Sequence, residues 1–392
     1  MAVDLLDHAF WVSALILVYT FAGYPLVMFL ASAMFPRPVG KARITPMVSL
    51  IIAAHNEEKG IREKIENSLA LDYPPERRQI IVASDCSTDR TDQIVREYSG
   101  RGVELVRLPE RLGKVPAQNL AVTKAQGDIL FFSDATILLP PDALAKMVRN
   151  FADLAVGCVS CEDKSISVKD GRRVEDEGLY VKYEMLLRRW ESGVGSIVGA
   201  SGCFFGIRKE LWTQPDDFLA EDFAMPLNIR EQGFRTVSEP EAIAYVKAVP
   251  SAGAEFARRV RTATHGLMGL FFKRHLLNPF RFGFFSVQLF SHKVLRFTVP
   301  VFMSIILVAN LFLVARGNLY LGIFALQICF YLGAGAGYLL RSSRYRPRIA
   351  SFPFYFVMVN VAIALAWVRV LQGRRHASWM PSQRISAADS HV

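Results

Sequence analysis

Three aspartates stand at or just after the ends of residue runs that are typical of buried β-strands. Asp85 and Asp134 each end such a run, and Asp222 comes directly after Glu221. An aspartate in this position often caps the helix that follows. In an open α/β sheet, however, ligands bind at the carboxyl ends of the strands. Three acids in register with that edge therefore predict a binding or catalytic site.

The elements that must position these acids alternate between strands and helices. Residues 48–54 have the pattern of a continuous buried strand, and residues 61–69 place Ile61, Ile65 and Leu69 on one helical face. A strand over 79–84, helices over 91–98 and 117–125, and a strand over 129–133 follow. Between residues 47 and 250 no stretch is long and apolar enough to cross a membrane. Residues 37–250 therefore predict an α/β domain made of βαβ units.

An apolar stretch without charged side chains, residues 9–35, precedes this domain. It exceeds the roughly 20 residues that cross a hydrocarbon core, so residues 1–36 predict a transmembrane helix. Arg37, Lys41 and Arg43 follow it. By the positive-inside rule they place the α/β domain in the cytoplasm and the N-terminus outside, in a multi-pass protein of the cell (inner or plasma) membrane.

Three more apolar runs, over 297–315, 317–340 and 349–368, predict further spans within residues 297–372. The basic loop 341–348 suits the cytoplasmic side. If the last run spans the membrane, the basic tail 373–392 lies outside, against the rule. If that run lies along the surface or re-enters, the tail stays inside, and the sequence leaves both arrangements open.

Residues 251–296 interleave basic and aromatic side chains, which predicts amphipathic helices in the headgroup layer. Lys and Arg total 46 against 36 Asp and Glu, and the excess lies beside the membrane segments. No nucleic-acid motif accompanies it, so membrane lipids rather than nucleic acid are the expected partner. Five cysteines fit a reducing setting. Cys158 and Cys161 lie in a predicted buried strand and are not expected to bind metal.

Six motifs follow one another along the chain. They are Val48-Ser-Leu-Ile-Ile-Ala-Ala-His-Asn-Glu-Glu58, Ser84-Asp-Cys-Ser-Thr-Asp-Arg-Thr91, Gly113-Lys114, Phe132-Ser-Asp-Ala-Thr136, Glu221-Asp222 and Arg258-x-x-Arg261. With the membrane segments, their order and spacing resemble the membrane-bound family 2 glycosyltransferases, which include cellulose, chitin and hyaluronan synthases. The resemblance implies a GT-A fold, an α/β nucleotide-sugar domain similar to a Rossmann fold, embedded between transmembrane helices.

The resemblance also implies how a nucleotide sugar, a UDP-sugar by the family pattern, is bound. Asp85 and the loop of Asn56 and Glu57 would accept hydrogen bonds from the base or ribose. Asp134 would help to hold Mg²⁺ or Mn²⁺ across the diphosphate, because hard divalent cations prefer carboxylate and phosphate oxygens. The fixed positive charges of the donor site would be those of Lys114, Arg258 and Arg261.

Asp222 is the predicted general base, which takes a proton from an acceptor hydroxyl during an inverting transfer. Glu221, if ionised, would raise the pKa of Asp222 by like-charge repulsion. The alternative for this pair is a surface acidic cluster near a helix start. Ser201 and Gly202 belong to a segment that forms either a close-approach wall of the acceptor site or a tight turn.

Two positions depart from the family pattern. The second carboxylate of the family's Asp-x-Asp is replaced by Thr136, which leaves Asp134 as the single metal-binding carboxylate of this motif. Arg261 is followed by Thr262, where processive members have a tryptophan that stacks on an acceptor sugar, and this weakens the case for a long polysaccharide.

The sequence thus predicts an inverting glycosyltransferase that makes or extends a β-linked glycan. One alternative is the transfer of a single sugar to a membrane lipid. A second alternative, from another class, is a catalytically silent subunit that binds nucleotide or glycan within a synthase complex.

Overall fold

The computed structural model describes residues 2–169, 172–175, 179–215, 219–247, 252–340 and 348–373. The described residues within 28–250 form one compact unit, the α/β unit. Those within 1–27 and 251–375 form a second, the helical unit. Residues 341–347 of the basic loop and 374–392 of the basic tail lie outside the described residues.

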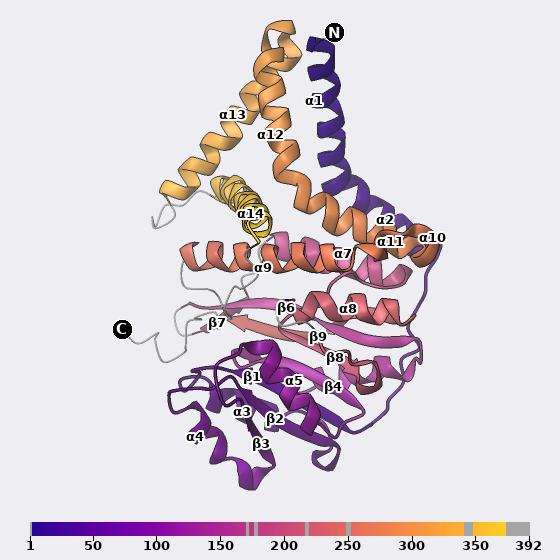
Figure 1. Ribbon diagram of the computed structural model, residues 1–392, viewed down its shortest axis with the longest axis vertical. Coiled ribbons are helices and arrows are strands. Elements are labelled where there is room, and N and C mark those ends of the chain that lie inside the picture. Colours follow the sequence, from indigo (N-terminus) through magenta and orange to yellow (C-terminus); the bar gives the residue numbers. More distant parts are fainter. Residues whose placement is uncertain are drawn as a thin grey trace. The chain divides into compact units, whose positions relative to one another are not determined.

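The α/β unit is built on one mixed sheet, whose nine strands are counted among the described residues (Figure 1). Their order is β3-β2-β1-β4-β8-β6-β9-β5, with β7 paired to β6. The first four strands of this order are parallel to one another, whereas β8 is antiparallel to both β4 and β6. The strands are β1 (Val48–Ala54), β2 (Arg78–Ser84), β3 (Val103–Arg107), β4 (Ile129–Asp134), β5 (Ile137–Leu138), β6 (Val156–Lys169), β7 (Arg172–Glu175), β8 (Phe204–Arg208) and β9 (Arg235–Lys247).

Helices cover both faces of this sheet. They are α3 (Ile61–Leu69), α4 (Thr91–Arg96), α5 (Lys114–Lys124), α6 (Ala143–Val148), α7 (Leu179–Val194) and α8 (Glu221–Glu231). Buried side chains of α3, α4 and α6 pack on one face, and those of α5 and α8 pack on the other. The strands and helices predicted from periodicity are confirmed, with shifts of a few residues at their ends.

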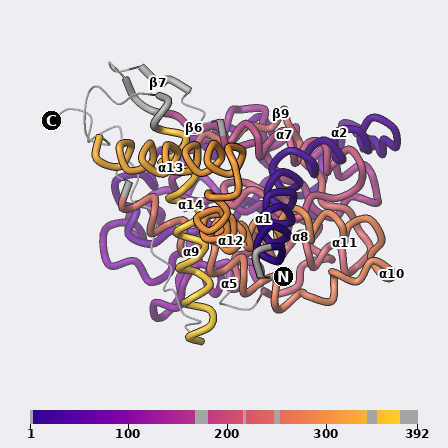
Figure 2. The backbone as a smooth tube through the Cα atoms, turned by 90° about the horizontal axis from the view of Figure 1, so that it is seen from above, coloured from indigo at the N-terminus to yellow at the C-terminus, as the bar shows by residue number. Residues whose placement is uncertain are grey.

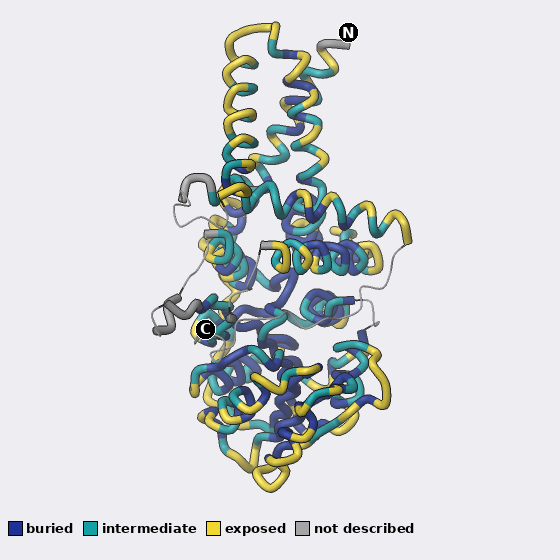
Figure 3. Tube along the Cα trace, turned by 90° about the vertical axis from the view of Figure 1, so that its left-hand side faces the viewer, coloured by how far each residue is buried: buried dark blue, intermediate teal, exposed yellow. Residues whose placement is uncertain are grey.

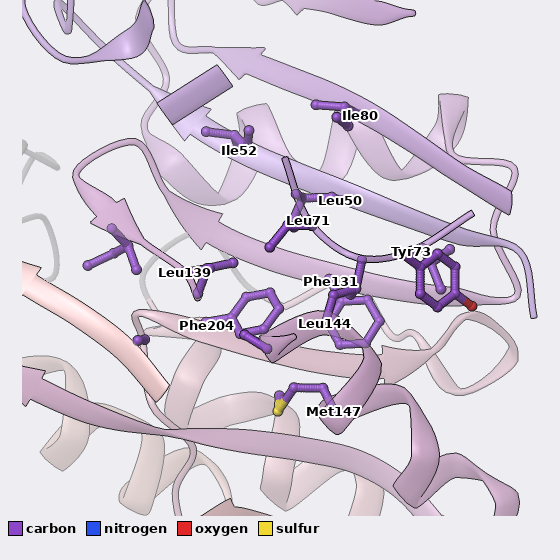
Figure 4. Packing of buried hydrophobic residues seen from close by; sticks show 14 of the residues in the cluster. Leu50, Ile52, Leu71, Tyr73, Ile80, Phe131, Leu139, Leu144, Met147 and Phe204 are labelled. Carbon is purple, nitrogen blue, oxygen red and sulfur yellow. The ribbon is translucent and has the colours of Figure 1, made fainter. Parts of the chain in front are cut away.

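Alternate residues of the central strands supply the two cores. Leu50 of β1 packs with Phe131 of β4 and Phe204 of β8 on one face (Figure 4). Phe132 and Phe205 point to the other face, where their rings stack at 5.1 Å between centroids. Because both faces are covered, these strands read as continuous apolar runs.

The helical unit supplies helices long and apolar enough to cross a membrane. Four such helices occur among the described residues: Asp4–Met34, whose last residues belong to the α/β unit, Phe284–Arg316, Asn318–Leu339 and Ser351–Leu371. At most 28% of the residues in their most apolar windows are buried, and exposed surface runs along them (Figure 3). This exposed apolar surface marks a membrane protein.

The helical elements are α1 (Ala2–Val18), η1 (Tyr19–Gly23), α2 (Tyr24–Met34), α9 (Ala252–Phe272), η6 (Arg274–Leu277), α10 (Pro279–Phe282), α11 (Phe284–Leu289), η7 (Phe290–Val294), α12 (Leu295–Leu313), α13 (Asn318–Leu339) and α14 (Arg348–Leu371). Val260, Ala263, Leu267 and Leu270 form a buried stripe on α9, so this helix is amphipathic as predicted. The apolar helix expected from residue 297 begins earlier, at Phe284, because the chain stays helical through the charged residues around η7.

Lys64 of α3 is fully buried beneath the end of β4. Its Nζ donates to Ser133 Oγ and to the backbone oxygen of Ile137, both at 2.8 Å. Burial lowers the pKa of Lys64 to about 7, against the attraction of Asp134. The lysine therefore ties α3 to β4 and β5 and carries a pH-dependent charge in the core.

This shift predicts how stability depends on pH. The ordinary pKa of Lys64 is 10.5 and the folded value is about 7, so the unfolded chain binds more protons between these values. Stability must then rise with pH across this window, by up to about 1.4 kcal/mol per pH unit from this one group. The measurement is thermal unfolding of the full chain in detergent. The melting temperature of the wild type minus that of Lys64→Met should increase from pH 7 to pH 10. A difference that stays constant over this range would contradict the prediction.

Candidate active site

The carboxyl ends of β1, β2 and β4 meet at one edge of the sheet. In the strand register Ala54 pairs with Ser84, and Ala53 pairs with Asp134. Asp85, the residue after β2, therefore lies at the same edge as Asp134, which ends β4. The structure brings these two predicted site residues together as the strand pattern indicated.

The loops that follow β1 and β2 hold each other in place. Asn56 has a left-handed backbone, with φ of 54°, and its Oδ1 accepts a hydrogen bond from the backbone N–H of Thr88 at 2.8 Å. The backbone N–H of Glu57 donates to Thr91 Oγ1, also at 2.8 Å. Asn56, predicted to contact the nucleotide, thus already uses its amide oxygen to shape the loop.

Asp85 is fully buried, and its two carboxylate oxygens have different surroundings. Oδ1 accepts from the backbone N–H groups of Leu112 and Gly113, each at 2.9 Å. Oδ2 is buried without a hydrogen-bond partner. An unsatisfied buried carboxylate oxygen is costly, and a ligand that donates an N–H or O–H to it would remove that cost.

Lys114, the first residue of α5, joins β4 to α8. Its Nζ lies 2.7 Å from Asp134 Oδ1 and also pairs with Glu221 Oε1. Desolvation works against the charge of this largely enclosed ammonium, whose side chain is 13% exposed, but Asp134 and Glu221 outweigh it and raise the pKa of Lys114 above its ordinary value. The lysine therefore remains charged and fixes the two carboxylates in one cluster.

Glu221 is only 6% exposed, at the first position of α8. It is therefore not part of a surface acidic cluster, which was the alternative for this pair. Lys114 balances the charge of Glu221, and the influence of Glu221 on Asp222 stays a prediction.

Asp222 is partly exposed and lies against Gly202. A Cβ added at Gly202 would stand 2.7 Å from Asp222 Oδ2. The backbone N–H of Ala200 donates to the backbone oxygen of Asp222 at 2.8 Å. Of the two alternatives for this segment, the geometry fits a close approach at Gly202.

Ser201 itself is almost completely buried. Its hydroxyl pairs with Asp163 and accepts from the backbone N–H of Cys203 at 3.0 Å, and its own N–H donates to Ser160 Oγ at 2.8 Å. Ser201 therefore shapes the segment through its hydroxyl and its N–H, and the acceptor role of Ser201 and Gly202 stays a prediction.

Arg258 and Arg261 lie on α9 in the helical unit. Arg258 donates through Nε and Nη2 to the two oxygens of Glu255, at 2.8 and 2.7 Å. The role of both arginines in donor binding stays a prediction.

The metal site predicted at Asp134 has few protein ligands. In the part of the chain that the structure describes, no group of three His, Cys, Asp or Glu side chains could hold a metal ion. A single carboxylate still fits Mg²⁺ or Mn²⁺ when substrate phosphates supply further oxygens.

Arg188 of α7 was not predicted as a site residue. Its Nη2 donates to the backbone oxygen of Ala200 at 3.2 Å, two residues before Gly202, and its Nη1 is buried without a partner. The adjacent Arg189 differs, because its guanidinium holds both oxygens of Glu162 at 2.7 Å. Sequence periodicity does not distinguish two neighbouring arginines on an amphipathic helix, so only the packing reveals Arg188.

The residues that form this edge are similar in sequence to those of known glycosyltransferases. Residues 49–213 match the model of the family described as "Glycosyl transferase family 2". Poly-β-1,6-N-acetyl-D-glucosamine synthase of Staphylococcus aureus is 25% identical over 228 residues, 56% of this chain and 54% of the relative. The β-monoglucosyldiacylglycerol synthase of Synechocystis is 35% identical over 118 residues, 29% of this chain and 25% of the relative. The chain thus spans about half the length, or less, of these curated relatives.

Among solved structures, the chain is similar to a mannosyltransferase from Pyrobaculum calidifontis in complex with GDP-Man and Mn²⁺. The TM-score is 0.72 at 25% identity, and the match covers 93% of this chain and 99% of the other. The predicted GT-A fold is confirmed by this likeness and by the mixed sheet. The chain therefore carries a family 2 glycosyltransferase domain, whose matched residues include Asp85, Lys114, Asp134 and Gly202.

Proposed function

We propose that the protein is a membrane-integrated, inverting glycosyltransferase that transfers a sugar from a nucleoside diphosphate sugar. The observation that carries the proposal is the cluster at the sheet edge, in which Lys114 joins Asp134 to Glu221 beside Asp222. It combines fixed positive charge with a partly exposed carboxylate, which are the groups that diphosphate departure and acceptor deprotonation require.

The donor's nucleotide would be recognised at Asp85. Its unpartnered Oδ2 suits a base with a ring N–H, as in uracil or guanine, or a ribose hydroxyl. The family resemblance favours UDP, and the similar mannosyltransferase is in complex with GDP-Man, so both nucleotides are candidates. Adenine, which lacks a ring N–H on its pairing edge, fits Asp85 less well.

A divalent cation is part of the proposal because the similar mannosyltransferase is in complex with Mn²⁺. Asp134 would hold the ion together with the donor's phosphate oxygens. Such an ion neutralises charge that develops on the departing diphosphate. Lys114 adds a second, permanent positive charge next to Asp134.

The transfer step follows from the position of Asp222. Its carboxylate would take the proton of an acceptor hydroxyl as that oxygen bonds to the anomeric carbon, while the bond from this carbon to the diphosphate breaks. Attack from the side opposite the diphosphate turns an α-linked donor into a β-linked product.

The proposed acceptor is a growing glycan, since one relative is a poly-β-1,6-N-acetyl-D-glucosamine synthase. A membrane lipid is the second candidate. Thr262 after Arg261 and the relative named β-monoglucosyldiacylglycerol synthase both favour it. The basic residues after the first apolar helix favour a cytoplasmic α/β unit and an outside N-terminus in the inner or plasma membrane.

The test of this function is a donor panel. Purified protein in nanodiscs should release UDP or GDP from one of the UDP- or GDP-sugars with Mn²⁺ or Mg²⁺, and it should stop in excess EDTA. ADP-sugars should be poor donors, and Asp85→Asn should weaken nucleotide binding while it keeps the Oδ1 contacts. A ladder of sugars in the product mass spectrum indicates a polymer, and one added sugar on lipid indicates the second candidate. Nucleotide binding without any turnover would instead support a silent synthase subunit.

The role of Asp222 predicts a separation of turnover from donor binding. Asp222→Asn should lower the transfer rate by roughly 10²–10⁴-fold, the usual contribution of a general base, with unchanged nucleotide affinity by calorimetry. Gly202→Ala should also lower the rate, because its Cβ would displace the Asp222 carboxylate. Gly195→Ala is the matched control, since nothing lies within 4 Å of the added carbon. Near wild-type transfer by Asp222→Asn would remove it as the base.

Arg188 is proposed to bind a phosphate group of a substrate through Nη1. Arg188→Gln should raise KM by roughly tenfold or more, the effect of a lost hydrogen bond to a charged group, and Arg188→Lys should restore part of it. The substitution removes an unpaired buried nitrogen together with the Nη2 bond to the backbone oxygen of Ala200, so the melting temperature should change little.

The neighbouring substitution, Arg189→Gln, should do the reverse and lower the melting temperature with little change in KM, because it unpairs Glu162. Separate KM values for donor and acceptor identify which substrate carries the phosphate. Equal KM values for Arg188→Gln and the wild type would rule out this role.

A further inference from the structure

The helical unit contains a cavity of 610 Å³. It falls within the range of about 300–1,000 Å³ that is typical of small-molecule sites. One wall comes from α1 and η1, and the other comes from the chain between η6 and the start of α12. The residues that line it are Leu15, Ile16, Tyr19, Leu277, Pro279, Ser286, Val287, Phe290, Ser291 and Leu295.

Each hydroxyl group in this lining already takes part in a hydrogen bond inside the protein. Tyr19 Oη and Ser291 Oγ are hydrogen-bonded at 3.0 Å, and Ser286 Oγ donates to the backbone oxygen of Leu276 at 2.7 Å. The remaining lining side chains are hydrocarbon. Because hydrocarbon makes up most of the lining and each hydroxyl already has a partner within the protein, the cavity suits an apolar chain.

The cavity lies between two helices that are apolar enough to cross a membrane, Asp4–Met34 and Phe284–Arg316. Within the helical unit α1 and α12 run side by side (Figure 2). Both helices contain a π-helical turn at the cavity, η1 (Tyr19–Gly23) and η7 (Phe290–Val294). Such turns are rare and occur frequently at functional sites.

The chain segment that forms the second wall has basic but no acidic side chains. Residues 273–296 supply seven of the ten lining residues and contain five Lys or Arg but no Asp or Glu. These basic residues are Lys273, Arg274, Arg281, Lys293 and Arg296. Near a membrane surface each such residue attracts anionic lipid by about 1 kcal/mol.

We propose that this cavity holds a hydrocarbon chain of an anionic, phosphate-bearing membrane lipid. The lining, which is mostly hydrocarbon, accommodates the chain, and the basic segment 273–296 neutralises the phosphate of the head group. The proposal requires neither turnover nor a particular acceptor, so it stands independently of the proposed function.

The test is photo-crosslinking of the purified full-length protein in detergent micelles. The probes are phosphatidylglycerol and phosphatidylcholine that carry the same diazirine-labelled acyl chain, and mass spectrometry maps the labelled residues. Phosphatidylglycerol should label the lining of the cavity, and phosphatidylcholine should label it several-fold less. Equal labelling by the two lipids would overturn the proposal.

Paired substitutions distinguish labelling inside the cavity from labelling of the general lipid-facing surface. Val287→Trp fills the cavity and should reduce its labelling by phosphatidylglycerol several-fold. Val301→Trp makes the same change in size at a 51% exposed position on α12 outside the lining and should leave the labelling unchanged. If Val287→Trp lowers the melting temperature, Leu277→Trp serves as a second filling variant. Undiminished labelling in a folded filling variant would overturn the proposal.

Discussion

The ion-pair cluster around Lys114 is the interaction on which the candidate site depends. One ammonium holds the start of α5, the end of β4 through Asp134 and the start of α8 through Glu221. Its burial disfavours the charge, and the two carboxylates together reverse that effect. The Lys114–Glu221 pair is the more buried of the two, with side chains 13% and 7% exposed, and loss of one partner from a buried pair is strongly destabilising, so α5 and α8 depend on each other most.

The position of Lys114 depends in turn on Asp85. Asp85 Oδ1 binds the two backbone N–H groups just before α5, while Oδ2 remains without a partner. A nucleotide that donates to Oδ2 would therefore be separated by one side chain from the segment that positions Lys114. This connects the proposed base-recognition point to the proposed diphosphate site through the Asp85 carboxylate and its two hydrogen bonds to the backbone before Lys114.

Sequence patterns were sufficient for the scaffold and for the edge at which the site forms. The strand over 48–54 was predicted residue for residue, because a strand buried on both faces is apolar throughout. Helix α5 begins three residues earlier than predicted, since Pro116 is tolerated in a first helical turn, where its missing N–H has no partner to lose. Helix α4 ends earlier than predicted, at Arg96. Strand-end aspartates pointed to the correct edge for the same topological reason that makes parallel strands end together.

The partners within that edge were not predictable, because they are set by packing between distant segments. Nothing in the sequence distinguishes the buried Lys64 from an exposed helical lysine, or Arg188 from Arg189. Packing also sets the charge around the predicted base. Lys114 pairs with Glu221 as well as with Asp134, so the acidic neighbour of Asp222 belongs to a buried ion-pair network that the sequence does not show. In the proposed transfer the placing of Asp222 would therefore fall to Gly202, because Asp222 Oδ2 lies 2.7 Å from where a Cβ of residue 202 would stand.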